Sequence, residues 1–154
     1  MKNIRKGLFE TNSSSVHSLC IYKNHGDYPE NIVFRRDHFS WGPEIRKDIT
    51  SRCSYLYECL LSIEDTNKRE GYFTQLEDFL KSRGILYKYD DDLDPYPCID
   101  HSEECISVIE ELFDSPILLE NFLFSDKSYL IIDNDNGYER IRIPDNRDYT
   151  VIRK

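Results

Sequence analysis

A short polar run near the start of the sequence brings hydroxyl groups and an imidazole close together. The run TNSSSVHS, residues 11–18, holds five hydroxyls and one histidine. Hydroxyls and successive backbone N–H groups suit the oxygens of a phosphate, and a neutral imidazole can take the proton of a serine hydroxyl. We therefore interpret the run as a site for a phosphate-bearing ligand, with Ser15 and His17 as catalytic groups. The ligand-binding residues in this interpretation are Thr11, Asn12, Ser13, Ser14 and Ser18.

The same run has a simpler interpretation as a turn, because Ser, Thr and Asn side chains readily bond to neighbouring backbone groups. It contains neither Gly nor Lys, so it is not the phosphate loop of the P-loop NTPases. The chain also lacks the Gly-x-Ser-x-Gly pattern, which argues against the hydrolases that use it. The sequence leaves both the ligand site and the turn open.

Two further polar stretches supply candidates for a general base and for metal ligands. His101 precedes an expected helix, and Asp133 and Asp135 stand at the end of an expected strand. Carboxylate oxygens suit Mg²⁺ and Mn²⁺, so we expect His101 and Asp133 as catalytic groups and Asp133 and Asp135 as ligands of such an ion. The competing interpretation is that NDNG, residues 134–137, is a hairpin turn.

Strands that position the first polar run are predicted in the first quarter of the chain. Residues 16–22 alternate in polarity and place His17 on one side of a strand. After turn signals at Gly26 and Pro29, the segment NIVFRR, residues 31–36, predicts a second strand. We expect these two strands to pair in an antiparallel manner.

Helical spacing of apolar residues predicts four helices in the middle of the chain. The first covers 43–63 and begins with its proline. The second covers 72–82 and ends before Gly84, forming a helical hairpin with the first. Ser102 is an expected N-cap for the third helix, and the fourth covers 116–124.

The last quarter of the chain again predicts strands, at 128–133, 138–143 and 149–152, with an Asn-Gly turn after the first of them. Another short strand is expected at 85–89. Strands at both ends and helices between them predict an α+β fold. We expect one compact domain, residues 1–154, in which a mixed or antiparallel sheet of N- and C-terminal strands is covered by the central helices.

Negative charge is concentrated in residues 90–126, which hold twelve Asp and Glu and no Lys or Arg, in a chain of net charge −9. Such a segment repels phosphates, which argues against direct DNA binding by this surface, and it suits a basic groove on a host defence protein. The competing interpretation is an ordinary solvated surface. The residues expected to contact such a partner are Asp90, Asp91, Asp92, Asp94, Glu103, Glu104, Glu110 and Glu111.

Cysteine usage and hydropathy bear on location. The chain has five cysteines and no Cys-x-x-Cys pair, which argues against a disulfide framework and a zinc knuckle. No apolar run approaches the roughly 20 residues that cross a bilayer. We therefore expect reduced thiols, a cytoplasmic location and no membrane association.

Several motifs occur in one order along the chain: RKGLFETNSSSVHSL, FSWG before a helix with YLYECLL, CIDH, and FLFSDKSYLIIDNDN. Together they resemble a group of small proteins found in phages, prophages and low-GC Gram-positive bacteria. The resemblance spans most of the chain and implies a setting, the cytoplasm of a bacterial host cell, more than a reaction. If the group shares a site, the resemblance implies that it is built from the polar stretches named above together with Asp100, Asn134 and Asn136.

Two functions follow from these features, and the sequence leaves open whether the protein is an enzyme. In the first, a mobile-element accessory protein binds or processes a nucleotide or a nucleic-acid end at a Ser/His/Asp site, which requires Ser13, His17, His101 and Asp133 to lie close together. In the second, a non-enzymatic acidic inhibitor mimics nucleic acid and blocks a host restriction or CRISPR effector. A scaffold role is the third interpretation.

Overall fold

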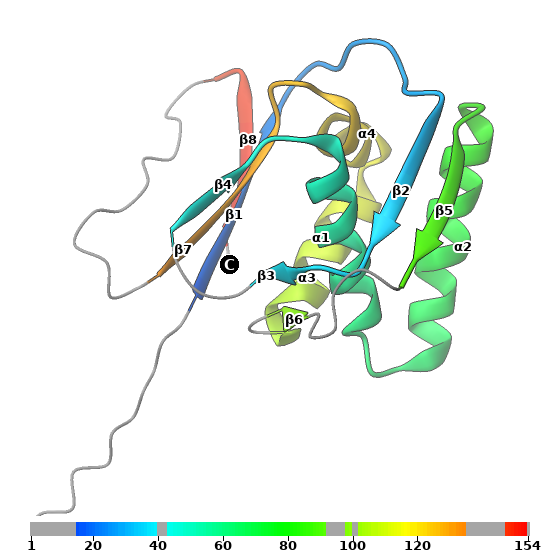
Figure 1. The fold of residues 1–154 in the computed structure, drawn as a ribbon, viewed down its shortest axis with the longest axis horizontal. Helices are drawn as coiled ribbons and strands as arrows, with labels where there is room; N and C mark the ends of the chain where they lie inside the picture. The colour runs from blue at the N-terminus through cyan, green and yellow to red at the C-terminus, as the bar shows by residue number, and fades with distance from the viewer. Residues whose placement is uncertain (1–14, 40–42, 92–97, 100–101, 135–146, 154) are drawn as a thin grey trace, which may run out of the picture.

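Four helices and a four-stranded sheet form most of the part of the chain that the computed structural model describes (Figure 1). Helices combined with an antiparallel sheet confirm the predicted α+β fold. The expected strand at 138–143 and the Asn-Gly turn before it lie outside the described part. The described residues are 15–39, 43–91, 98–99, 102–134 and 147–153.

The sheet is built around β1 (Ser15–Tyr22), which matches the alternation predicted over residues 16–22. β7 (Tyr129–Asn134) and β8 (Tyr149–Arg153) pair with its two edges. β4 (Glu44–Arg46) extends the sheet beyond β7, and every pairing is antiparallel. The predicted sheet of N- and C-terminal strands is therefore confirmed, with one extra edge strand.

The second strand, β2 (Asn31–Arg35), does not pair with β1, so the expected antiparallel pairing of these strands is wrong. β2 pairs in parallel with β5 (Leu86–Asp90) in a separate two-stranded sheet. Its buried residues Ile32 and Phe34 belong to the same core cluster as α1 and explain why the strand lies against that helix. Parallel strands need a long crossover, and α1 and α2 supply it.

The first helix, α1 (Ile49–Leu61), begins later than the predicted start at Pro43. Its N-cap is Asp48, whose carboxylate accepts the backbone N–H of Ser51 at 2.7 Å. The residues directly after Pro43 form β4 at the edge of β7 instead of a first helical turn. The prediction missed this boundary because it gave the proline more weight than the capping aspartate.

The second helix, α2 (Thr66–Ser82), begins before the predicted residue 72, because Asp65 caps it by accepting the N–H of Lys68 at 3.0 Å. It ends as predicted. Gly84 follows with φ at 70°, the left-handed conformation that glycine adopts without strain. α1 and α2 contact each other, as the predicted helical hairpin requires.

The third helix, α3 (Ser102–Asp114), begins at the residue predicted to cap it, and the fourth, α4 (Pro116–Phe124), matches its predicted range. The hydroxyl of Ser115 caps α4 by accepting a first-turn N–H at 3.3 Å. Before α3, the short strand β6 (Cys98–Ile99), which was not predicted, pairs in parallel with β3 (His38–Phe39).

α1 lies between the four-stranded sheet and the β2–β5 pair (Figure 1). On one side, the Tyr55 hydroxyl lies 3.2 Å from His17 of β1. On the other side, the hydroxyl of Ser54 accepts the N–H of Arg35 in β2 at 3.3 Å. Residues 52–60 are consequently all buried, and the polar side chains among them must find partners inside the protein.

The four cysteines whose side chains are described are free thiols within the core. Cys20, Cys53, Cys59 and Cys105 are all buried. Burial raises the pKa of Cys20 to about 11 and that of Cys53 to about 12. A thiol with such a pKa stays protonated near neutral pH and is a poor nucleophile, so these side chains contribute packing.

Arg52 is the most deeply buried charged residue of α1, with no exposed surface. Its Nη1 donates to the carbonyl of Lys47 at 2.5 Å and to that of Ser128. Its Nη2 donates to the carbonyls of Leu123, at 3.2 Å, and Ser125, at 2.7 Å. One side chain thus satisfies the backbone at the end of α4 and at the turn into β7.

Replacing Arg52 by Met should lower the free energy of unfolding by at least about 3 kcal/mol, because the buried carbonyls of Leu123 and Ser128 lose this donor. Urea unfolding followed by circular dichroism measures this loss. The control is Arg69→Met, which should cost about 1 kcal/mol, because among the described residues the Arg69 side chain donates to one carbonyl, that of Ile63 at 3.2 Å. Equal losses in the two variants would contradict the role given to Arg52.

Candidate functional site

His17 is buried on the face of the sheet that packs against α1, with 5% of its surface exposed. Its Nδ1 lies 3.2 Å from the Tyr55 hydroxyl, and the two rings meet edge to face with centroids 5.5 Å apart. Tyr55 in turn packs edge to face against Phe39 at 5.3 Å. The predicted catalytic histidine is therefore held by an aromatic cluster between β1 and α1.

Strand register separates His17 from Asp133. His17 is opposite Ile132, whereas Asp133 is opposite Val16. Directly opposed residues share a face of the sheet and successive residues alternate between faces, so Asp133 lies on the face away from His17. The two side chains expected to act together are not brought together.

The other predicted site residues are placed only in part. Ser15 begins β1, in register with Asn134, and Ser18 is buried on the same face as Asp133. Within the described ranges, no group of three His, Cys, Asp or Glu side chains is arranged to hold a metal ion. The predictions for Thr11, Asn12, Ser13, Ser14, Asp92, Asp94, His101 and Asp135 lie outside the described residues, as do those for the side chains of Glu103 and Glu104.

The acidic segment presents carboxylates on the outer side of α3. Glu110, Glu111 and Asp114 are exposed, while the apolar residues between them face the core. Glu110 pairs with Lys68 of α2 at 2.8 Å, and both of these side chains are exposed. Asp91 is also exposed and accepts the hydroxyl of Tyr57 at 2.8 Å.

Glu120 differs from the rest of the acidic segment because it is buried among donors. Arg83 donates to its carboxylate from Nε at 2.5 Å, and the Tyr28 hydroxyl donates to the same oxygen. His25 places Nε2 at 3.4 Å from the other oxygen. The Arg83 guanidinium also lies over the ring of Phe79, 3.7 Å from its centroid.

This cluster joins the loop before β2 to the end of α2 and the middle of α4, and sequence reasoning missed it. The usable signal was the position of Glu120 within PILLENFLF, since a charged residue in an apolar helix is rarely buried without a partner. Burial by itself would raise the pKa of Glu120, but the hydrogen bonds from Tyr28 and Arg83 and the charges of Arg83 and His25 hold that pKa below its ordinary value. The cluster is therefore suited to holding the loop in place.

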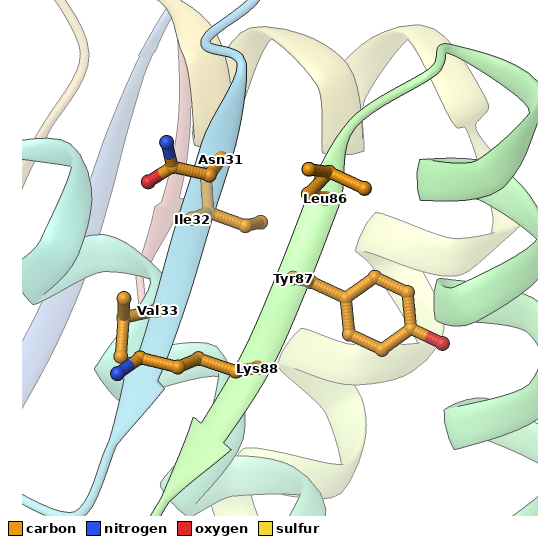
Figure 2. Close-up of a pocket in the computed structure, with 6 residues that line it drawn as sticks. All are labelled: Asn31, Ile32, Val33, Leu86, Tyr87 and Lys88. Carbon is orange, nitrogen blue, oxygen red and sulfur yellow. The ribbon is translucent and has the colours of Figure 1, made fainter.

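A shallow pocket of about 220 Å³ follows the β2–β5 pair (Figure 2). Leu86 at its rim is 72% exposed, a large value for an apolar side chain. Figure 2 shows Lys88 extending across the pair toward Val33, with which it is in register. Sequence reasoning missed this pocket, because the pocket depends on the parallel pairing of β2 with β5, which was not predicted. The lining residues are Asn31, Ile32, Val33, Leu86, Tyr87 and Lys88.

Comparison with known protein families, with curated proteins and with solved structures finds no match for this chain. Among the helices that the structure describes, none combines the length and the apolar character that a membrane crossing requires. Any functional conclusion must therefore be drawn from the residues and contacts given above.

Replacing Glu120 by Gln should destabilise the protein at neutral pH by about 1–2 kcal/mol. A lowered pKa means that the ionised carboxylate stabilises the folded state above its ordinary value of 4.5, and that this stabilisation is lost as the pH falls and the group is protonated. The difference between the variant and the wild type should therefore shrink as the pH falls below that value.

Urea unfolding at a series of pH values, from about pH 7 to about pH 3, measures this dependence. Glu70→Gln is the control, because Glu70 is an exposed glutamate of α2. It should leave stability nearly unchanged throughout. A Glu120→Gln deficit that is constant across the whole range would be the contrary result.

Proposed function

We propose that this chain is a non-enzymatic binding protein that presents an acidic surface to a basic groove of a host defence nuclease, as a mimic of nucleic acid. The observation that carries the proposal is the row of exposed carboxylates on α3, within a segment that has no Lys or Arg from residue 90 to residue 126. The separation of His17 from Asp133 removes the main support for a joint catalytic role of these residues.

Charge spacing on α3 supports this function. Glu110, Glu111 and Asp114 lie within four helical steps, or about 6 Å along the axis at about 1.5 Å per residue. Three charges over this length are on average about 3 Å apart along the axis, close to the spacing of about 3.4 Å between phosphates along one strand of duplex DNA. A groove that binds phosphates through Lys and Arg would meet a similar density of negative charge.

The ion pair between Lys68 and Glu110 does not prevent such binding. Lys68 and Glu110 are both exposed, and exposed pairs contribute only about 0.2–1 kcal/mol. A Lys or Arg of the partner can replace Lys68 at little cost. Because the attraction is between exposed charges, binding should weaken as salt is added.

The test is inhibition of DNA cleavage by a panel of purified restriction and CRISPR nucleases. The wild type should inhibit at least one of them, and the combined variant Glu110→Lys, Glu111→Lys and Asp114→Lys should inhibit it at least tenfold less. Adding 0.5 M salt should weaken inhibition by the wild type to a similar extent.

A matched control changes the same amount of charge elsewhere. The combined variant Glu64→Lys, Glu70→Lys and Asp78→Lys alters three exposed residues of other elements. It should inhibit as the wild type does. The proposal would be contradicted if the wild type inhibited no nuclease of the panel, or if both triple variants lost inhibition equally.

A second candidate function is binding of a phosphate-bearing ligand at the start of β1. It is favoured by the contact between His17 and Tyr55, a polar pair buried in an otherwise apolar part of the core. Ser15 lies two positions before His17 on the same strand, directly after the hydroxyl-rich run. In this form of the proposal Asp133 takes no part.

Calorimetric titration with nucleotides and cyclic nucleotides, with and without Mg²⁺ or Mn²⁺, tests this second function. Binding should be weakened at least tenfold by Ser15→Ala and by Tyr55→Phe, and should be unchanged by Asp133→Asn, because Asp133 lies on the other face of the sheet. Circular dichroism shows whether each variant is folded. Absence of binding to the wild type, or equal sensitivity to Asp133→Asn, would reject it.

A further inference from the structure

The β2–β5 pair is an unusual sheet, because parallel strands normally lie inside larger sheets that are covered on both faces. One face of this pair packs on α1 through Ile32 and Phe34. The other face, with Asn31, Leu86 and Lys88, is exposed. An uncovered strand edge is a ready template for another extended chain.

Hydrogen bonds define which backbone groups of β2 face its outer edge. At the two ends of the pairing, the N–H of Leu86 donates to the carbonyl of Glu30 at 3.0 Å, and the N–H of Arg36 donates to the carbonyl of Asp90 at 3.2 Å. Even-numbered residues of β2 therefore bond to β5. The N–H of Arg35 points the other way, to the hydroxyl of Ser54 at 3.3 Å.

Backbone groups of a strand alternate between its two edges, so those of Asn31 and Val33 lie at the same edge as the N–H of Arg35. Ser54 occupies the end of this edge beside Arg35. In the part of the chain that the structure describes, no strand pairs with β2 at this edge. Over Asn31 to Val33 this edge therefore has no strand partner among the described residues, and Ile49 and Thr50 of α1 lie beyond it.

A hollow of about 160 Å³ lies beside this edge, between β2 and the start of α1. Binding sites for small molecules usually have about 300–1,000 Å³, so the hollow is suited to one side chain. The side chain would be apolar, since Pro29, Ile32, Val33 and Ile49 supply most of the surface around it, with Asn31 and Thr50 at the margin.

Charge on the outer face restricts the occupant further. Arg35 and Lys88 are exposed, and in the described ranges neither belongs to a salt bridge. Asp90, in register with Arg35, is half-buried on the same face, so these two cations outnumber it there. A strand added to β2 would place every second side chain beside the outer-face residues of β2. Acidic side chains at those positions would complement the two cations.

We propose that β2 binds an extended segment of a partner protein in which apolar and acidic residues alternate. The backbone of the segment pairs with Asn31 and Val33, an apolar side chain fills the hollow next to Ile49, and the acidic side chains face Arg35 and Lys88. This surface is distinct from the acidic side of α3 and does not depend on the function proposed for it.

The probe is a labelled, capped peptide SEVEVES, with SKVKVKS as the charge-reversed comparison, and the measurement is fluorescence anisotropy. The full chain should bind SEVEVES at least tenfold more tightly than SKVKVKS. Val33→Pro should weaken binding at least tenfold, since it removes an N–H at the outer edge that the pairing with β5 does not use. Ile49→Glu should weaken it similarly by placing a charge at the hollow.

Charge variants separate the outer face from general electrostatics. The combined variant Arg35→Glu and Lys88→Glu should bind SEVEVES at least fivefold more weakly, whereas Arg153→Glu, at an exposed position of β8, should stay within twofold of the wild type. A SEVEVES peptide with N-methylated valines should not bind to the wild type, which tests backbone pairing even if Val33→Pro does not fold.

Three results would overturn the proposal. The first is no binding of SEVEVES to the wild type, and the second is equal binding of its N-methylated form. The third is self-association of the chain in sedimentation that Val33→Pro abolishes and that SEVEVES does not displace, because the occupant would then be a second copy.

Discussion

One buried guanidinium connects the two halves of the chain. Arg52 comes from the central helix, and the carbonyls that it satisfies belong to the end of α4 and the approach to β7. Without Arg52, the carbonyls of Leu123 and Ser128 would lose this buried donor, whereas that of Ser125 also accepts the N–H of Ser128 at 3.2 Å. The position of β7 against β1, and with it the whole register of the main sheet, therefore depends on a polar interaction within the core.

Burial on all sides explains why α1 contains so many interior polar groups. Glu58, one of them, accepts from Arg36 at 2.8 Å and from the N–H of Asp37 at 3.0 Å. This fixes the chain between β2 and β3 on one side of the helix, while Arg52 fixes the turn before β7 on the other side. An apolar helix could pack in several rotations, and these two residues specify one.

Local patterns predicted most elements, and long-range pairing explains most failures. The alternation of polarity around His17 was sufficient to predict β1, and the helical spacing of apolar residues was sufficient to predict α3 and α4. The starts of α1 and α2 were readable in principle from Asp48 and Asp65, which have the ordinary capping role. The pairing of β2 with β5 could not be predicted, because nothing in NIVFR, residues 31–35, indicates a partner strand that comes two helices later in the chain.

The candidate site was less predictable than the fold for the same reason. Alternation shows that Val16 and His17 point to opposite faces, but only the register with β7 shows that Asp133 belongs with Val16. A shift of one residue in the pairing of β1 with β7 would have placed Asp133 on the same face as His17. The Glu120 cluster was hidden in a similar way, since its partners Tyr28 and Arg83 are distant in sequence.

The central position of β1 has a consequence for biosynthesis. Both strands that flank β1 are made more than a hundred residues after it, and a ribosome that adds about 5–20 residues per second needs on the order of 5–20 s to supply them. During that time Leu19 and Ile21, fully buried in the finished molecule, have no partner strands. The nascent chain therefore resembles a chaperone client, and the main sheet closes only after the last strand has left the exit tunnel.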